Sequence, residues 1–257
     1  MIELKKYKRF FAFGCSMTKY FWPTWADIIS KEFKESYNFG KSGAGNMFIA
    51  LQIAEANQRY NFNRDDLVMV MWSGITREDR YVNQVWQTPG NIYTQNYYDD
   101  TFIKKYTDVR GYLIRDLGLI SLTQQMLKRS NCEFHMLQMN QFVEDPSNYY
   151  SYSKNDPKQG LSDVIDLYKD LLDSIKPDLL TVGCNGKWPQ VPIYHNENQQ
   201  IDYHPTPDVH LSYLQQIFLN LPLSEETIKW VGAQERIVRK AKRIDNLPQL
   251  RSNTTSL

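Results

Sequence analysis

Residues 9–16 read RFFAFGCS, and this stretch decides how the rest of the chain is interpreted. Four apolar residues follow Arg9, which predicts a buried strand, and Gly14 allows a tight turn directly after it. Residues 67–72, LVMVMW, form a second apolar run. A run without polar alternation is typical of a strand covered on both faces, as in a parallel sheet. The two runs therefore predict an α/β fold.

Helical and strand patterns alternate along the rest of the chain. Further strands are expected at 37–39, 133–139 and 178–182, and helices at 23–33, 46–60, 109–130, 161–175, 207–219 and 225–243. Strands that alternate with helices predict a doubly wound sheet with right-handed crossovers. We therefore expect a three-layer α/β/α sandwich with a flavodoxin-like, mostly parallel sheet of about five strands.

Two polar segments, residues 83–106 and 141–160, interrupt this pattern and are interpreted as insertions. They divide a domain of residues 1–223, and residues 224–257 are expected to form a basic helix and a tail. The basic residues of this last segment are Arg236, Arg239, Lys240, Lys242 and Arg243. A solvated helix face, an anionic partner and a subunit contact each explain such a cluster.

Composition excludes several classes of protein. The chain of 257 residues has 30 basic and 29 acidic residues, a balance that argues against a specific nucleic-acid binder. No apolar run approaches the roughly 18 residues of a membrane-spanning helix. Cys15, Cys132 and Cys184 have no CxxC spacing, so neither a disulfide framework nor a zinc site is expected. The apolar N-terminal stretch is too short for a signal peptide, so cytoplasmic synthesis is expected, and later virion association stays open.

The first segment with chemical potential is Gly14-Cys15-Ser16. A serine directly after a strand and a tight turn can present its hydroxyl near backbone N–H groups, as a nucleophile requires. The alternative is a serine that only caps the next helix.

A second segment, residues 38–46, reads NFGKSGAGN and contains three glycines in six residues. Glycines let a backbone amide approach a ligand closely. The pattern matches neither GxxxxGK[ST] nor GxGxxG, which disfavours a nucleotide site. A tight connection into a helix from Asn46 is the other interpretation.

The third segment, residues 202–210, reads DYHPTPDVH and holds two of the four histidines. Asp202 beside His204 is a candidate oriented general base, and Asp208 with His210 is the alternative pair. No third group stands at metal-ligand spacing, so no metal is expected. A surface His-Pro turn without a catalytic role is also possible on this segment alone.

Together the three segments resemble the SGNH (GDSL-type) hydrolase superfamily over about residues 8–220. The combination is similar to a branch of hydrolases common in tailed phages and bacteria. The resemblance implies that Ser16 is the nucleophile, that Asp202 and His204 act on it, and that the Gly43 N–H contributes to the oxyanion hole. His204 is favoured over His210 because the family's base precedes the proline-containing turn into the last helix.

The chain departs from the family pattern at three places. Cys15 replaces the usual aspartate, and residues 71–77, MWSGITR, lack the asparagine of the third block. Asn46, Ser73 or Thr76 is expected to supply an oxyanion donor instead. In addition, Asp202 precedes His204 by two residues rather than three, so the carboxylate must orient the imidazole differently or the partner lies elsewhere.

The resemblance implies a serine esterase without a cofactor. Aromatic residues in the insertions suit sugar rings, so an O-acetyl group on a polysaccharide is the expected substrate, with a small-molecule ester as the simpler case. The alternatives are a non-catalytic binding or virion-structural protein and an acyltransferase. Because every candidate catalytic group precedes residue 232, deletion of residues 232–257 is expected to leave activity largely intact.

Overall fold

The centre of the molecule is a parallel sheet of four strands in the order β2-β1-β3-β6. A computed structural model describes residues 2–93, 97–142, 161–195 and 201–248. The strands are β1 (Arg9–Phe13), β2 (Glu35–Asn38), β3 (Asp66–Trp72) and β6 (Glu133–Gln138). The chain runs outward from β1 to β2 and then returns past β1 to β3, which makes the sheet doubly wound.

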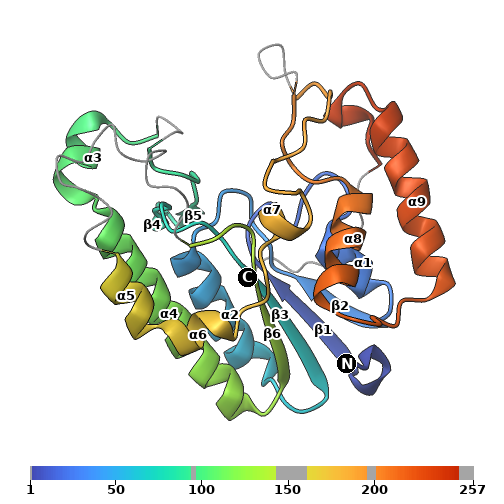
Figure 1. The fold of residues 1–257 in the computed structure, drawn as a ribbon, viewed down its shortest axis with the longest axis horizontal. Coiled ribbons are helices and arrows are strands. Elements are labelled where there is room, and N and C mark those ends of the chain that lie inside the picture. The colour runs from blue at the N-terminus through green and yellow to red at the C-terminus, as the bar shows by residue number, and fades with distance from the viewer. Residues whose placement is uncertain (1, 94–96, 143–160, 196–200, 249–257) are drawn as a thin grey trace.

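Helices cover both faces of this sheet and produce the expected three-layer α/β/α sandwich (Figure 1). One face carries α2 (Asn46–Tyr60), α4 (Val109–Ser130), α5 (Ser162–Leu167) and α6 (Lys169–Asp173). The other carries α1 (Trp25–Ser30), α8 (Pro207–Ile217) and α9 (Glu225–Lys240). Short 3-10 helices occur at Leu4–Lys6 and Ile244–Asn246. Among the described helices, none combines the length and the apolar character needed to cross a membrane.

The expected fifth strand is absent from the described residues. Residues 178–182 instead contain the short helix α7 (Leu179–Val182), and the Asp178 side chain accepts a 2.7 Å hydrogen bond from the Thr181 N–H. Aspartate is a favoured N-cap, and this local bond stabilises a helical turn over a strand. The expected single helix at 161–175 is likewise two short helices that meet at Tyr168.

The first insertion, predicted at 83–106, is more regular than its composition predicts, and its structure begins just before it at Arg80. β4 (Arg80–Val82) and β5 (Val85–Gln87) form an antiparallel hairpin, and α3 (Asp100–Tyr106) follows. Asn83 and Gln84 connect the strands with positive φ angles of 51° and 63°, as a two-residue hairpin turn requires. Residues 143–160, most of the second insertion, lie outside the described residues.

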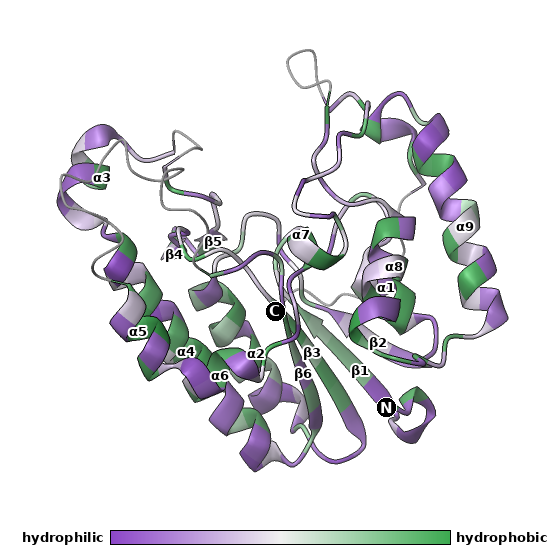
Figure 2. Cartoon of the chain, in the orientation of Figure 1, coloured by the Kyte–Doolittle hydropathy of each residue, from purple (hydrophilic) through white to green (hydrophobic). Residues whose placement is uncertain are grey.

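The core lies between the central strands and the helices on both faces. Residues 67–72 of β3 are 0% exposed, and residues 10–13 of β1 are at most 1% exposed. Figure 2 shows these strands as largely hydrophobic, whereas the outer helices carry hydrophilic residues toward solvent. The uninterrupted apolar runs of the sequence therefore correspond to strands buried on both faces.

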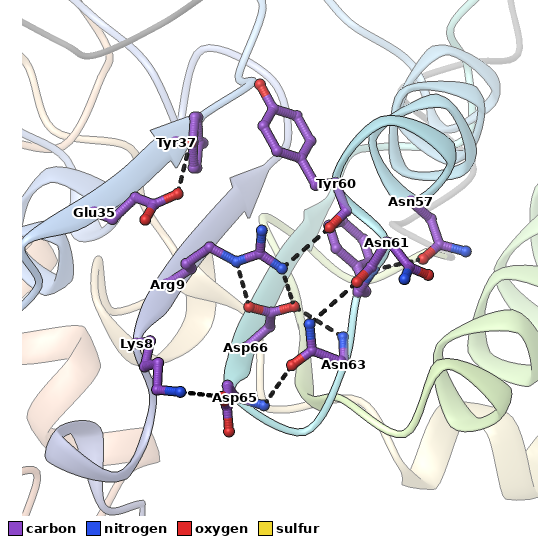
Figure 3. A network of polar contacts seen from close by, with 11 residues as sticks. Lys8, Arg9, Glu35, Tyr37, Asn57, Tyr60, Asn61, Asn63, Asp65 and Asp66 are labelled. Atoms are coloured by element: carbon purple, nitrogen blue, oxygen red, sulfur yellow. Dashed lines mark hydrogen bonds and ion pairs between the residues drawn. The ribbon is translucent and has the colours of Figure 1, made fainter.

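An ion-pair network joins the amino ends of β1 and β3 (Figure 3). The Arg9 guanidinium donates to both carboxylate oxygens of Asp66 at 2.7 Å, and it also donates to the Tyr60 carbonyl at 3.1 Å. Such a bidentate pair fixes the register of two neighbouring strands. The network occupies the end of the sheet opposite to Ser16 and leaves the carboxyl end for function.

Helix α9 belongs to the packing of the domain rather than to a separate tail. It packs on α8, and its Val231 is part of the main core. Its Val238 lies in a second buried cluster with Trp22, Val191 and Ile193, beneath the segment that leads to His204. These contacts oppose the expectation for deletion of residues 232–257, because the deletion would remove part of that cluster and so weaken the His204 segment.

Candidate active site

Ser16 lies in a turn directly after β1 and is 7% exposed. The turn is closed by a 2.9 Å bond from the Thr18 N–H to the Cys15 carbonyl. A Cβ at Gly14 would stand 2.0 Å from the Thr18 hydroxyl oxygen and 2.9 Å from the Met71 carbonyl oxygen. Only glycine allows β1 to turn this closely against β3, and this approach positions the serine at the carboxyl end of the sheet.

Ser16, His204 and Asp202 form a continuous hydrogen-bonded chain. Ser16 Oγ lies 2.9 Å from His204 Nε2, and His204 Nδ1 lies 2.8 Å from Asp202 Oδ1. Because an ionised carboxylate only accepts, Nδ1 carries the proton and Nε2 is free to accept from the serine hydroxyl. The structure thus brings together two residues that are 188 positions apart in sequence. It also holds His204 in the tautomer that a general base requires.

The short spacing between Asp202 and His204 is accommodated by a local loop. Asp202 Oδ1 accepts both the ring Nδ1–H and the backbone N–H of His204, the latter at 2.7 Å. Burial alone would raise the pKa of Asp202, but the hydrogen bonds and the charge of His204, together with the Tyr20 hydroxyl, outweigh burial and hold the pKa at about 2. Asp202 is therefore ionised at neutral pH.

The glycine-rich segment lies beside the serine turn. The Phe39 N–H donates to the Ala12 carbonyl at 2.8 Å, and the Lys41 N–H donates to the Gly14 carbonyl at 3.0 Å. Gly43 has φ +73°, and a Cβ there would lie 2.0 Å from the Thr88 carbonyl oxygen. The hairpin insertion thus packs directly on this segment, where a side chain at residue 43 would be both strained and excluded.

Asn46 and Ser73, which the sequence suggested as oxyanion donors, bond to other groups instead. The Asn46 amide donates to the Ser73 carbonyl at 3.0 Å and to Asp116 at 2.8 Å. Its oxygen accepts the Ser73 N–H at 2.8 Å and the Ser73 hydroxyl at 3.3 Å. This expectation is therefore corrected: both N–H groups of the amide are used to join α2, β3 and α4.

The alternative base pair is not assembled. His210 is 1% exposed within α8, and burial, with a smaller contribution from His204, lowers its pKa to about 3. Asp208 accepts from the Thr206 hydroxyl and pairs with Arg239 at 3.3 Å. Asp208 acts on His210 only through its charge, and among the described residues no hydrogen bond or ion pair joins the two. A histidine that stays neutral and buried is poorly suited to proton transfer with a substrate.

Three residues near the site were missed by the sequence argument. Tyr20 and His195 both contact the second carboxylate oxygen of Asp202. Asp79 is buried and accepts the Gly45 and Phe48 N–H groups at 2.8 and 2.9 Å, which fixes the glycine segment at the start of α2. The scarcity of histidine was a usable signal for His195, whereas nothing in the local pattern marks Tyr20 or Asp79.

Within the described ranges, no group of three or more His, Cys, Asp or Glu side chains is arranged to hold a metal ion. The groups that the structure does bring together at the site are the Ser16 hydroxyl, the His204 imidazole and the Asp202 carboxylate.

No protein-family model and no curated protein matches the chain. Several solved structures are similar to it. A GDSL-like lipase from Bacteroides thetaiotaomicron is 14% identical with a TM-score of 0.41, over 90% of each chain. A catalytic mutant of an acetylxylan esterase from Geobacillus stearothermophilus is 12% identical with a TM-score of 0.44, over 85% of this chain and 97% of that one.

A third similar structure is a member of the lipolytic protein G-D-S-L family from Veillonella parvula. It is 14% identical with a TM-score of 0.40, and the match covers 83% of this chain and 100% of that one. Of these three structures, two are described as GDSL-like or G-D-S-L proteins and the third as an acetylxylan esterase.

Proposed function

We propose that this chain is a serine ester hydrolase of the SGNH type. Ser16 is the nucleophile, His204 the general base, and Asp202 the group that orients His204. The observation that carries the proposal is the unbroken path from Ser16 Oγ to His204 Nε2, at 2.9 Å, and from His204 Nδ1 to Asp202 Oδ1, at 2.8 Å. Nucleophile, base and orienting carboxylate in this order are the requirements for acyl transfer through a serine.

The reaction has two halves. His204 Nε2 takes the hydroxyl proton as Ser16 Oγ attacks the ester carbonyl, and the resulting imidazolium gives that proton to the departing alcohol. Water then attacks the acyl-serine, with His204 taking and returning one proton, and the carboxylic acid leaves. The backbone N–H groups of Ser16 and Gly43 are proposed to bind the oxyanion, because the Lys41–Gly14 hydrogen bond keeps these two turns adjacent.

A carbohydrate O-acetyl group is the proposed substrate. Exposed aromatic rings project from elements connected to the site. Tyr81 of the hairpin is 61% exposed, and its ring centroid lies 5.5 Å from that of Trp86. Phe21 is 51% exposed and packs beside the His195 ring. The hairpin is joined to the glycine segment through a 2.8 Å bond from Thr88 to Ser42. Aromatic faces of this kind stack on sugar rings, which supports a saccharide near the serine.

The catalytic proposal is tested with p-nitrophenyl acetate. We expect hydrolysis by the native chain and a loss of about 10³-fold or more in Ser16→Ala. Ser121→Ala, in α4, is the matched control and should keep full activity. A fluorophosphonate probe provides a second measurement, because mass spectrometry should locate a single covalent adduct on Ser16. Activity that survives in Ser16→Ala would contradict the proposal.

The substrate proposal is tested by comparing acetylated xylo-oligosaccharides with p-nitrophenyl esters. Tyr81→Ala should raise KM for the acetylated oligosaccharide severalfold and leave p-nitrophenyl acetate hydrolysis unchanged, because only the sugar reaches the hairpin. An equal effect on both substrates would contradict a saccharide subsite and leave a small-molecule esterase.

A non-catalytic binding protein is the second candidate, and the Asn46 contacts favour it. The Asn46 amide donates to Ser73 and Asp116, and the Ser73 N–H and hydroxyl donate to Asn46, so neither Asn46 nor Ser73 has a donor left for the oxyanion. Loss of one such donor lowers turnover by about 10²–10³-fold. An unlabelled Ser16 after fluorophosphonate treatment, together with saccharide binding, would support this candidate over the esterase.

A further inference from the structure

The carboxylate of Asp202 is held at both of its oxygens. Oδ1 accepts the two N–H groups of His204, whereas Oδ2 is contacted by the Tyr20 hydroxyl and by His195 Nε2. Asp202 is 1% exposed, so these protein groups take the place of water around it. A buried carboxylate with several donors cannot rotate without losing hydrogen bonds, and each such loss is costly in a low-dielectric site.

Tyr20 also contacts the other member of the pair. Its ring stacks on the imidazole of His204 with ring centroids 3.7 Å apart and an interplanar angle of 19°. One side chain therefore restricts both the rotation of the Asp202 carboxylate and the tilt of the His204 ring. The stack covers one face of an imidazole whose side chain is 25% exposed.

The segment that contains Tyr20 is anchored to the loop that contains His204. Trp22 Nε1 donates to the Pro205 carbonyl at 2.8 Å. The Trp22 ring also packs edge-on against the Tyr20 ring, with ring centroids 4.7 Å apart. The His195 ring lies beside both Tyr20 and Phe21, with ring centroids 6.5 and 5.8 Å away. Residues 20–22 stand four to six positions after Ser16, so one short segment connects the serine turn to the histidine loop.

The two-residue spacing explains why such support is useful. Because Asp202 folds back on the His204 backbone, a single oxygen serves both N–H groups of that residue. Contacts at that oxygen alone leave the Asp202 carboxylate free to rotate about it, and such a rotation would misalign the His204 imidazole. Contacts at the second oxygen and on the ring face remove this freedom.

We propose that Tyr20 and His195 are positioning residues that orient His204 through Asp202, with Tyr20 having the larger effect. The inference rests on the proposed esterase function. The titratable groups that face Asp202 are Tyr20, His195 and His204, and His210 from α8 lies close enough to His204 to interact with it electrostatically. Tyr20 touches His204 only through the face of its ring, and both residues direct their hydrogen bonds to Asp202, so both should act on turnover rather than on substrate binding.

The test measures kcat, KM and the pH profile of p-nitrophenyl acetate hydrolysis. Tyr20→Phe keeps the ring stack and removes the hydroxyl, and we expect kcat to fall about tenfold with KM unchanged within twofold. Tyr20→Leu removes both contacts and should lower kcat about 100-fold. Tyr203→Phe, an exposed tyrosine in the same loop, is the matched control and should behave as the native chain.

His195 is tested by loss and rescue. His195→Ala should lower kcat about fivefold, and His195→Gln should restore most of that loss because the amide can donate to Asp202. In Tyr20→Phe, the rising limb of the kcat/KM profile should move to higher pH, because the unshared charge on Asp202 stabilises the imidazolium. A residue that only stabilised the fold would not move this limb.

Proton NMR provides a measurement independent of turnover. The His204 Nδ1–H that bonds to Asp202 should give a resonance far downfield in the native chain and in Tyr203→Phe. In Tyr20→Leu this resonance should broaden or disappear, because the proton then exchanges with water more often. Its persistence in Tyr20→Leu would overturn the positioning role whether or not the chain hydrolyses esters.

The two proposals give different failures. If Ser16→Ala is inactive but Tyr20→Phe and Tyr20→Leu match the native kcat and pH profile, the positioning role is overturned and the esterase stands. If the native chain neither hydrolyses esters nor reacts with the probe, the esterase is overturned, and the NMR comparison alone decides whether Tyr20 holds the Asp202–His204 pair.

Discussion

The two halves of the site are built by different means. Ser16 follows β1, which has backbone hydrogen bonds to β2 on one side and β3 on the other. His204 lies in the connection between α7 and α8, whose described residues, 183–195 and 201–206, contain no helix and no longer strand pairing than the Val191–Asp202 bridge. Ser16 is thus positioned by a continuous backbone ladder, whereas His204 is positioned by one isolated backbone bridge at Asp202 together with side-chain contacts.

This difference has a consequence for robustness. A strand in the middle of a sheet unfolds only with the domain, whereas a loop held mainly by individual side chains and one bridge can open locally at lower free energy. The serine side should therefore respond to backbone changes, and the histidine side to single side-chain changes. The following predictions are ordered from the largest expected effect to the smallest.

The largest effect is expected from Asp202→Asn. An amide cannot stabilise the His204 imidazolium or select its tautomer, so kcat for p-nitrophenyl acetate should fall about 10³–10⁴-fold. The double variant with Ser16→Ala should be no less active than Ser16→Ala alone, because the residues act as one unit. Asp208→Asn is the control, and activity within threefold of the native value is expected. A large loss in Asp208→Asn would instead support the alternative pair with His210.

Gly14→Ala should affect stability most on the serine side. The new Cβ would stand 2.0 Å from the Thr18 hydroxyl oxygen and 2.9 Å from the Met71 carbonyl oxygen. We expect the free energy of unfolding in urea to fall by about 3 kcal/mol. Gly118→Ala in α4 is the control, since its nearest neighbour is 3.8 Å away, and it should be neutral or slightly stabilising. Equal stability of the two variants would refute the tight-turn explanation.

Acid should weaken the histidine side through His210, which follows the loop in α8. Its folded pKa is lowered to about 3 mainly by burial, so the unfolded chain takes up a proton near pH 6.5 that the folded chain refuses. Stability is therefore complete above about pH 6.5 and is lost as the pH falls toward 3. At pH 5 the loss from this group should be about 2 kcal/mol.

Urea unfolding at pH 8 and pH 5 measures this effect, with His210→Gln as the variant. His135, whose pKa burial lowers to about 4, contributes a similar slope that the variant retains. Asp202, with a pKa of about 2, contributes a constant amount to stability above about pH 4, and this contribution is lost only at lower pH. It therefore does not affect the difference between pH 8 and pH 5. The same pH 8 to pH 5 difference in His210→Gln and in the native chain would contradict the prediction.

The smallest effect is expected from Val238→Ala in α9. Removing two methyl groups from the cluster beneath the His204 segment should cost about 1.5 kcal/mol and lower kcat severalfold. Hydrogen exchange should become faster in residues 201–206 and stay unchanged in residues 9–13. Ile237→Ala, whose side chain is 37% exposed, serves as the control. Faster exchange in both regions would show that the two halves of the site open together.

Much of the fold could be predicted because it depends on local patterns. The apolar runs at 9–13 and 67–72 and the helical spacing at 46–60 and 109–130 correspond to β1, β3, α2 and α4. The prediction at 178–182 was wrong because an apolar segment this short shows neither a strand nor a helix periodicity. The hydrogen bond from the Thr181 N–H to the Asp178 side chain then stabilises a helical turn there. The hairpin at 80–87 was missed because its turn uses Asn83 and Gln84 without the usual glycine.

The sequence by itself determined the strand–turn position of Ser16, the glycines beside it and the Asp-x-His segment, because each depends on residues adjacent in the chain. Only the tertiary structure decided that His204 rather than His210 meets Ser16, that Asn46 bonds to Ser73 and Asp116, and that Tyr20 and His195 hold Asp202. Those contacts join segments far apart in sequence. Their geometry follows from how helices pack on the sheet, which no local pattern encodes.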